Sequence, residues 1–305
     1  MNILITGGAG FIGSHVADFL LEKGHRVTII DDLSTGRESN IPAGCDFVKM
    51  SISDPALADV FQKKQFDAVY HLAAQIDVRK SMQSPSDDVM LNVVGSLKLL
   101  EHCRNFNVRK FIFASSGGAI YGEQDYFPAD ENHIHHPLSI YGVDKLAVEH
   151  YMFAIHKDCG LDCVALRFAN VYGPRQNHLG EAGVVAIFTN RMLKNQPATI
   201  NGDGKQTRDY VYVHDVAEIN RLSLDLEGFN VINVGTGVET DVIEIHKILS
   251  DKTGCQLPPN FGAAQPGEQQ RSSLSCDHAL KLLNWKPQMK LEDGLEQTVR
   301  WFQCL

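Results

Sequence analysis

Two side chains that stand four residues apart, Tyr141 and Lys145, have the chemistry needed to move a proton. A spacing of i, i+4 places both on one face of the helix that we predict over residues 141–156. A lysine cation close to a phenol stabilises the phenolate, so it should lower the pKa of the tyrosine toward the operating pH. Ser116 follows a predicted strand over residues 110–114, and its hydroxyl can hold the substrate oxygen that Tyr141 deprotonates. These three residues are the predicted catalytic set.

Three glycines form a turn that fits a phosphate group. Gly7, Gly10 and Gly13 follow a predicted strand over residues 2–6 and open a helical pattern over residues 12–23. Gly7 allows a tight turn, Gly10 lets the main chain approach a pyrophosphate, and Gly13 lets the helix pack closely on the strand. The free N–H groups and partial positive charge of the helix N-terminus would face the phosphates. This βαβ context predicts a dinucleotide site rather than a turn without a ligand.

The second predicted strand, over residues 26–30, ends in two carboxylates, Asp31 and Asp32. A carboxylate at this position accepts hydrogen bonds from the adenosine ribose hydroxyls and repels a 2′-phosphate. Arg37 could in principle serve a 2′-phosphate, but an arginine in a solvated loop is the simpler interpretation. We therefore predict NAD rather than NADP as the cofactor.

The order of the elements predicts the scaffold that positions these residues. Apolar strands over residues 46–50, 68–71 and 163–168 continue the alternation with helical patterns, one of which covers residues 89–104. Regular alternation of strand and helix predicts a Rossmann-type doubly wound parallel sheet with helices on both faces. Ligands of such sheets bind beyond the carboxyl ends of the strands, where the glycine turn and Ser116 would lie.

The alternation weakens after Pro174, where glycine, proline and polar residues cluster. We interpret residues 1–174 as an NAD-binding Rossmann domain to which segments near residues 210–240 return. Residues 175–305 would mainly form a smaller C-terminal α/β domain that binds the substrate.

The composition excludes several classes of protein. Of the 305 residues 44% are hydrophobic, which is too many for a disordered chain, and the formal net charge of −9 argues against nonspecific nucleic-acid binding. The seven cysteines include no CxxC pair, and His133, His135 and His136 lack the spacing of a closed zinc site, so we expect neither disulfides nor a metal. We see no signal-peptide pattern and no apolar run long enough for a bilayer, so we expect a cytoplasmic protein without a membrane partner.

Further motifs occur in order along nearly the whole chain, and the ordered set is highly specific. They are residues 7–13, 31–32, 71–74 (HLAA), Asn92, 115–122 (SSGGAIYG), 141–145 (YGVDK), 166–175 and 208–213. Together they resemble the NAD-dependent epimerase/dehydratase family of extended short-chain dehydrogenases/reductases, and within it the 4-epimerases that act on UDP-hexoses.

The resemblance implies a role for each matching residue. Ser116 and Tyr141 would contact the sugar 4-hydroxyl, and Lys145 would hold the nicotinamide ribose and tune Tyr141. The implied NAD contacts are Gly7, Gly10, Phe11, Ile12, Gly13, Asp31, Asp32, Ser34, Thr35, Gly36, Ser51, Ile52, Leu72, Ala73, Ala74, Asn92, Ala114, Ser115, Tyr141, Lys145 and Phe168. The implied UDP-sugar contacts are Gln75, Ser116, Tyr141, Asn170, Val184, Arg208, Tyr210, Glu268, Arg271 and Ser272. Arg208 would pair with the diphosphate, the alternative being a structural salt bridge with Asp209 or another acid.

The residues after Ser116 favour one reaction of this family. Dehydratases and decarboxylases of the family place an acidic residue beside the catalytic serine or threonine, whereas Gly117 and Gly118 follow here. The resemblance therefore implies C4 epimerisation of a UDP-hexose through a 4-keto intermediate, with UDP-glucose and UDP-galactose or their N-acetylated pair as substrates. The alternatives are another nucleotide-sugar oxidoreductase, dehydratase or decarboxylase, and a catalytically silent NAD-binding protein. The presence of all three catalytic residues argues against the silent protein.

Two further expectations concern assembly and substrate breadth. Apolar residues occupy a broad arc of the two helical patterns over residues 89–104 and 141–156. One face of each helix must cover the sheet, and the remaining apolar side chains could form a four-helix homodimer interface. The residues in this arc are Val89, Val93, Leu97, Leu100, Val148, Met152 and Ile155. The resemblance places Ser272 at a position where a bulky tyrosine excludes a 2-acetamido group. Serine there predicts room for UDP-N-acetylglucosamine, unless Arg271 fills the space.

Overall fold

Seven parallel strands form the central sheet of the computed structural model, which describes residues 1–179, 183–264 and 269–305. Their order is β11-β6-β5-β4-β1-β2-β3. The strands are β1 (Asn2–Thr6), β2 (Arg26–Asp31), β3 (Asp46–Lys49), β4 (Ala68–His71), β5 (Lys110–Ser116), β6 (Asp162–Phe168) and β11 (Phe229–Val234). The predicted Rossmann-type sheet is confirmed, and each of the six strands expected from the sequence is present within two residues of its predicted ends.

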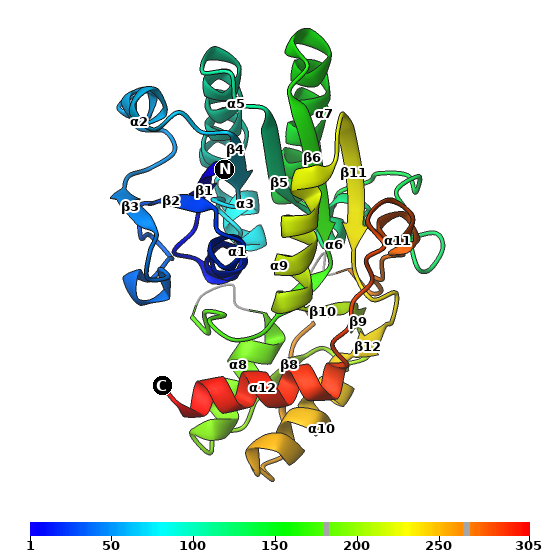
Figure 1. Cartoon of the computed structure of the whole chain (residues 1–305). Helices are drawn as coiled ribbons and strands as arrows, with labels where there is room; N and C mark the ends of the chain where they lie inside the picture. The colour runs from blue at the N-terminus through cyan, green and yellow to red at the C-terminus, as the bar shows by residue number, and fades with distance from the viewer. Residues whose placement is uncertain (180–182, 265–268) are drawn as a thin grey trace.

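Helices cover both faces of the sheet, as Figure 1 shows with α1 and α9 in front and α5 and α7 behind. One face carries α1 (Phe11–Glu22), α9 (Val213–Leu222) and α11 (Asp277–Leu283), and the other carries α2 (Leu57–Lys64), α5 (Gly95–Asn105) and α7 (Ile140–Cys159). Because successive strand residues point to opposite faces, Ile3 and Ile5 pack with the first layer while Leu4 packs with the second. The buried strands are apolar on both faces for this reason.

Chain segments from the C-terminal half return to the sheet. Strand β11 pairs in parallel with β6, and α9 lies against α1. Ala279 of α11 and the nearby Trp285 also belong to this hydrophobic core, a second return that the sequence pattern did not predict. The division into two domains with separate binding roles stays a prediction.

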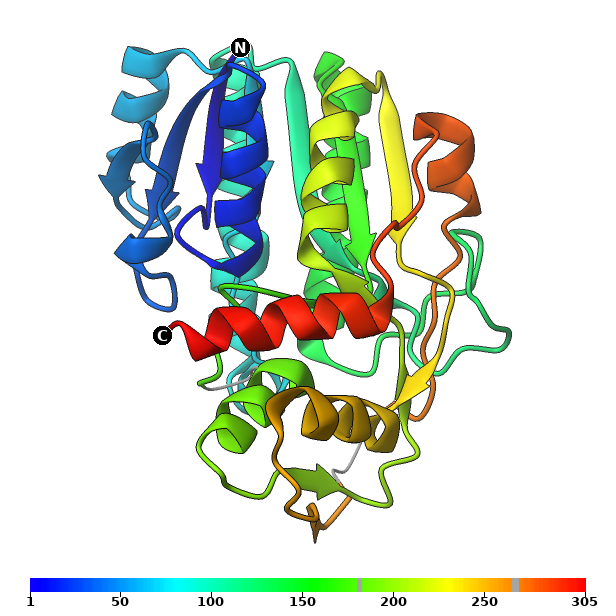
Figure 2. The ribbon, with the colours of Figure 1, turned by 60° about the horizontal axis from the view of Figure 1, so that its bottom comes forward.

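The remaining C-terminal elements build a third hydrophobic core below the sheet, where α12 crosses in Figure 2. They are α8 (Val184–Leu193), α10 (Val242–Thr253) and α12 (Leu291–Gln303), with the strand pairs β7 (Asn170–Tyr172) and β10 (Tyr210–Tyr212), β8 (Thr199–Asn201) and β13 (Asn260–Gly262), and β9 (Thr207–Arg208) and β12 (Thr240–Asp241). Short helical segments are η1 (Glu38–Asn40), α3 (Val78–Gln83), α4 (Pro85–Val89), α6 (Gly117–Ile120) and η3 (Ser223–Asp225). Within the described part of the chain, no helix is both long and apolar enough to span a membrane.

The helix predicted over residues 89–104 is present, with a π-helical turn that the sequence did not predict. It runs from the end of α4 through the π turn η2 (Met90–Val94) into α5. The π turn carries Asn92, whose side chain accepts from the Gln75 main-chain N–H at 2.9 Å and donates to the Gln75 carbonyl at 3.0 Å. π turns occur often at functional sites, and this one fixes the loop that follows β4.

Candidate active site

The carboxyl ends of the parallel strands bring the predicted cofactor residues to one edge of the sheet. Gly7 has a φ of 72°, and a Cβ there would lie 2.6 Å from the Ala73 main-chain nitrogen. A Cβ on Gly13 would overlap the Gly7 carbonyl. The glycine turn and the loop after β4 therefore come into main-chain contact, which a side chain at Gly7 would prevent. The N-terminus of α1, which follows this turn, can receive a phosphate group. This cradle fits the pyrophosphate of a dinucleotide.

The two carboxylates at the end of β2 have different surroundings. Asp31 is buried, and its oxygens accept from Ala9 N at 3.0 Å and Leu33 N at 2.9 Å. Burial raises the pKa of Asp31, while these two hydrogen bonds oppose the rise. Asp32 is exposed and accepts from Ser34 N at 2.9 Å. Both carboxyls thus lie beside the glycine turn, with Asp31 also holding that turn in place.

The other predicted cofactor residues lie along the same edge. Ser51 and Ile52 follow β3, and the partly buried Leu72, Ala73 and Ala74 follow β4. Ser34 and Thr35 are exposed in the loop after β2, where Gly36 lies against the Asp31 carboxyl. Phe11 and Ile12 begin α1, and Phe168 ends β6. These residues therefore lie along the carboxyl edge of the sheet.

The three predicted catalytic residues meet where β5 ends and α7 begins. Ser139 caps α7, because its side chain accepts from Gly142 N at 3.1 Å, and Tyr141 follows in the first turn. The Ser116 side chain lies near enough to the Tyr141 phenol to influence its pKa. Lys145 Nζ donates to the Ala114 carbonyl at 2.8 Å and lies 5.6 Å from the centre of the Tyr141 ring. The predicted juxtaposition of a serine, a tyrosine and a lysine is therefore present.

Burial of the phenol works against the expected lowering of the Tyr141 pKa. Burial raises the pKa of Tyr141 to about 12, the Ser116 hydrogen bond opposes the rise, and the nearby Asp88 carboxylate adds to it. Lys145 Nζ lies 5.6 Å from the ring centre and is tied to the Ala114 carbonyl. Oxidised nicotinamide, when bound, would add positive charge that favours the phenolate.

Buried charges that the sequence did not single out surround Lys145. Burial lowers the pKa of Lys145 to about 8, and the carboxylates of Asp144, Asp88 and Glu149 oppose this. Asp88 and Asp144 are each 2% exposed, and burial, together with the neighbouring Asp88 carboxyl, raises the pKa of Asp144 to about 7. The site is thus a buried cluster in which one cation faces several acids. Asp144 directly precedes Lys145 in the sequence, but only the fold places it near Asp88.

Ser115 does not aim its hydroxyl at the predicted cofactor surface. It is 3% exposed and donates to Glu149 Oε1 at 2.5 Å. Any contact of Ser115 with a cofactor would come from its main chain. Glu149 and its partner Arg167 were also missed, although Glu149 stands four residues after Lys145 on the same helix face and Arg167 interrupts an apolar strand.

The predicted substrate residues lie below the catalytic group. The side-chain oxygen of Asn170 faces Gly118, 3.6 Å from where a Cβ would stand, and Val184 begins α8. Arg208 is in β9 and Tyr210 is buried in β10. Gln75 lies in the loop after β4, with its amide donating to Asp88 at 2.5 Å. Glu268 lies outside the described residues.

Arg271 and Ser272 lie side by side in sequence but differ in burial. Arg271 donates to both oxygens of Glu239, at 3.0 and 2.6 Å, and stacks on Phe127 with 3.8 Å between guanidinium and ring centre. Ser272 is 2% exposed. Arg271 is thus held by Glu239 and Phe127, while the adjacent Ser272 side chain is buried. Its pairing with a substrate anion stays a prediction.

Comparison with known proteins places the chain in a family. Residues 3–235 match the model of the NAD dependent epimerase/dehydratase family. A UDP-glucose 4-epimerase from Mycolicibacterium smegmatis is 41% identical over 309 residues, covering 99% of both chains. The crystal structure of a Thermotoga maritima UDP-glucose 4-epimerase with UDP-glucose has a TM-score of 0.98 and 45% identity, covering 100% of this chain and 99% of that one. A UDP-N-acetylglucosamine 4-epimerase from Methanobrevibacter ruminantium, in complex with UDP-N-acetylmuramic acid, has a TM-score of 0.94 and 36% identity, covering 99% and 98%.

The fold and site define a Rossmann-type nucleotide-sugar enzyme with a serine, tyrosine and lysine at the strand ends. The chain belongs to the NAD-dependent epimerase/dehydratase family, which confirms the resemblance seen in the sequence.

Proposed function

We propose that this protein interconverts UDP-glucose and UDP-galactose by NAD-dependent epimerisation at C4. The observation that carries the proposal is the placement of Ser116 at the end of β5 beside Tyr141 and the buried Lys145 of α7, with glycines and no acid following Ser116. Such a site can remove a hydroxyl proton but offers no neighbouring acid to protonate a leaving hydroxyl. The names of the Mycolicibacterium and Thermotoga relatives support the same reaction.

The chain's own residues carry the proton chemistry of this reaction. When bound, NAD supplies the hydride acceptor and donor. Ser116 holds the sugar 4-oxygen, Tyr141 accepts its proton, and Lys145 contributes positive charge next to the phenolate. The same phenol returns the proton after the 4-keto sugar has turned over. Because both transfers occur in one site, NAD ends unchanged.

The test is incubation of the purified protein with UDP-glucose in the presence of NAD. We expect NMR to show UDP-galactose forming toward an equilibrium mixture, while absorbance at the reduced-nicotinamide band shows no net NADH. Net accumulation of NADH would indicate a dehydrogenase, and loss of the carboxyl from UDP-glucuronate in a substrate panel would indicate a decarboxylase. Either result would contradict the proposal.

The carboxylates after β2 predict cofactor preference. NAD should bind at least tenfold more tightly than NADP, because Asp31 and Asp32 would face the 2′-phosphate of NADP. Fluorescence titration with both dinucleotides measures the ratio of the Kd for NADP to the Kd for NAD. Asp32→Asn, which removes one charge at the exposed position, should lower this ratio. Tighter binding of NADP to the wild-type chain would overturn the assignment.

Substrate breadth depends on the buried Ser272. We expect the wild-type chain to accept UDP-N-acetylglucosamine, because serine is small and Arg271 is paired with Glu239. Ser272→Tyr should raise the kcat/KM ratio of UDP-glucose to UDP-N-acetylglucosamine at least tenfold by filling the pocket. Ser272→Ala is the matched control, since it keeps the space and should keep the N-acetyl sugar as a substrate. An unchanged ratio in the tyrosine variant would show that Ser272 is not the gate.

We further propose that the protein is a homodimer, but with an interface that differs in detail from the sequence expectation. Several residues of the expected arc are buried in the chain itself: Leu100, Val148 and Met152 pack in the core with the sheet, and Val93 is also buried. The exposed apolar side chains on the adjoining α4, η2 and α7 are Val89, Met90, Leu91, Val143, Tyr151 and Phe153. A four-helix contact through this surface would cover them.

Light scattering at micromolar concentration tests the dimer. We expect twice the mass of one chain, and Tyr151→Glu should shift the mass toward a monomer because a charge would be buried. A wild-type chain that is monomeric throughout would contradict the proposal.

Location and domain roles are also proposals. Residues 1–174, with the segments that return, would bind NAD, and residues 175–305 would mainly bind the UDP-sugar. We propose a cytoplasmic enzyme, and the seven free cysteines support this, because disulfides are rare in that compartment.

A further inference from the structure

A buried polar network lies directly behind the catalytic group. Arg167 donates to both oxygens of Glu149, from Nε to Oε1 at 3.0 Å and from Nη2 to Oε2 at 2.6 Å. The two side chains are only 3% and 4% exposed. Ser115 adds a third donor to the same carboxylate, at 2.5 Å from Glu149 Oε1. Every charge in this group therefore has a partner, as a dry interior requires.

The network joins the elements that carry the catalytic residues. Ser115 immediately precedes Ser116 at the end of β5, and Glu149 stands on α7 four residues after Lys145 and eight after Tyr141. The Glu149 carboxylate thus connects the strand end to the helix at a point one turn beyond Lys145. The bond from Lys145 to the Ala114 carbonyl is a second tie between the same two elements, so the placement has two supports.

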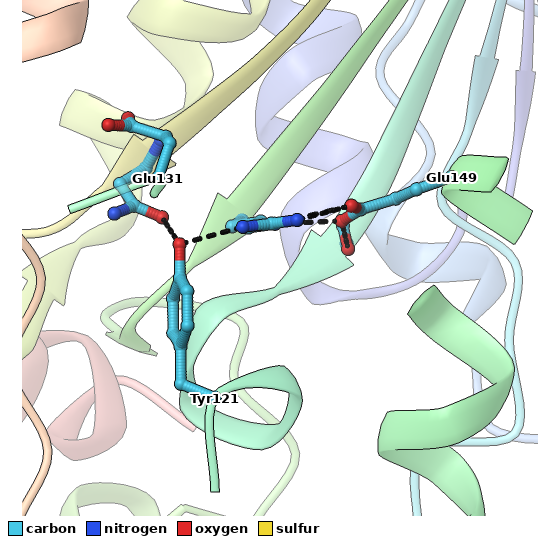
Figure 3. A network of polar contacts seen from close by, with 6 residues as sticks. Tyr121, Glu131 and Glu149 are labelled. Atoms are coloured by element: carbon cyan, nitrogen blue, oxygen red, sulfur yellow. Dashed lines mark hydrogen bonds and ion pairs between the residues drawn. The ribbon is translucent and has the colours of Figure 1, made fainter. Parts of the chain in front are cut away.

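The network continues to the far side of the site. Arg167 Nη1 donates to the Tyr121 hydroxyl at 2.8 Å, and that hydroxyl donates to Asn233 Oδ1 at 2.7 Å. Figure 3 shows this line of bonds from Glu149 past Tyr121 toward Glu131, whose Oε1 accepts from Asn233 N at 2.7 Å. One connected system therefore spans β5, α7, β6 and β11 behind the reacting groups.

Stability alone does not require charges here, because apolar side chains of similar volume often pack as well as a buried ion pair. We propose that Ser115 and Glu149 are positioning residues: their hydrogen bond holds Ser116, at the end of β5, in register with the face of α7 that carries Tyr141 and Lys145. The inference rests on the proposed epimerase function. Neither residue touches the sugar in this scheme, so their effect is on the rate of the chemical step rather than on binding.

The test removes the hydroxyl rather than the carboxylate. Changing Glu149 to an apolar residue would leave the Arg167 guanidinium buried without an opposite charge, and we expect the chain to unfold. Ser115→Ala keeps the ion pair and should lower kcat about tenfold with KM changed by less than about twofold, because a small misplacement of reacting groups slows the chemistry. Ser115→Thr keeps a hydroxyl donor and should restore most of kcat.

Ser223→Ala is the matched control. Ser223 is also fully buried and donates to a carbonyl, Ile219 O, at 2.7 Å, but it lies in η3 before the amino end of β11. This variant should keep the wild-type kcat, and the Tm of Ser115→Ala should fall no further than that of the control.

The outcomes separate the inference from the proposed function. A wild-type kcat in Ser115→Ala overturns the inference. An equally large fall in kcat in Ser115→Thr also overturns it, because the hydroxyl would then not be the group that matters. A tenfold rise in KM of Ser115→Ala would assign the Ser115 hydroxyl to substrate binding and would also overturn the inference. Absence of epimerisation by the wild-type chain is a different result, because it removes the proposed function itself.

Discussion

Tyr141→Phe should lower kcat by two to four orders of magnitude, the range over which a positioned acid–base group contributes. The variant removes only the phenol oxygen, which lies near Ser116 and would accept the proton of the sugar hydroxyl. The phenyl ring still fills the space beside Lys145, whose Nζ lies 5.6 Å from the ring centre. Folding and NAD binding should therefore be close to those of the wild type. Initial rates with UDP-glucose, together with a thermal melt and a dinucleotide titration, measure all three properties.

Tyr151→Phe is the control for this experiment. It makes the same change on the same helix, but at a side chain that is 43% exposed. Its kcat should stay at the wild-type level. Near-normal turnover in Tyr141→Phe would show that another group moves the proton, and the mechanism proposed above would have to be abandoned.

Lys145→Met should lower kcat about a hundredfold and weaken NAD binding, because a preorganised charge in a dry site acts strongly on developing charge. Methionine has a similar length and is apolar, so the buried position remains filled. The variant loses the cation near the Tyr141 phenol and the bond to the Ala114 carbonyl. It also leaves Asp144 and Asp88 without the positive charge that partly offsets them. Stopped-flow or steady-state rates give kcat, and quenching of protein fluorescence gives the Kd for NAD.

The comparison variant is Lys157→Met, an exposed lysine further along α7 that lies over the Phe153 ring. It should leave kcat and the Kd for NAD unchanged. If Lys145→Met binds NAD as tightly as the wild type and turns over at a similar rate, Lys145 has neither of its proposed roles.

Much of the site could be predicted because it depends on short-range spacing. The glycine turn follows β1 and opens α1 as expected, and the structure explains Gly7 by its φ of 72° and by its approach to Ala73. Tyr141 and Lys145 share a helix face because they stand four residues apart. Ser116 and Asp31 reach the same edge because parallel strands all end there. Helical and strand periodicities are properties of the local chain, so these features can be read from the sequence.

The sequence by itself thus determined the sheet, the loops at its carboxyl edge and the three reacting groups. Only the tertiary structure decided the environment of those groups. It raised the pKa of Tyr141 through burial, brought the carboxyls of Asp144 and Asp88 close together, and formed the Glu149–Arg167 ion pair. Desolvation and charge pairing depend on which distant segments meet and how much water they exclude. The spacing of residues along the chain does not specify these contacts, which form only when α4, β6 and α7 pack together.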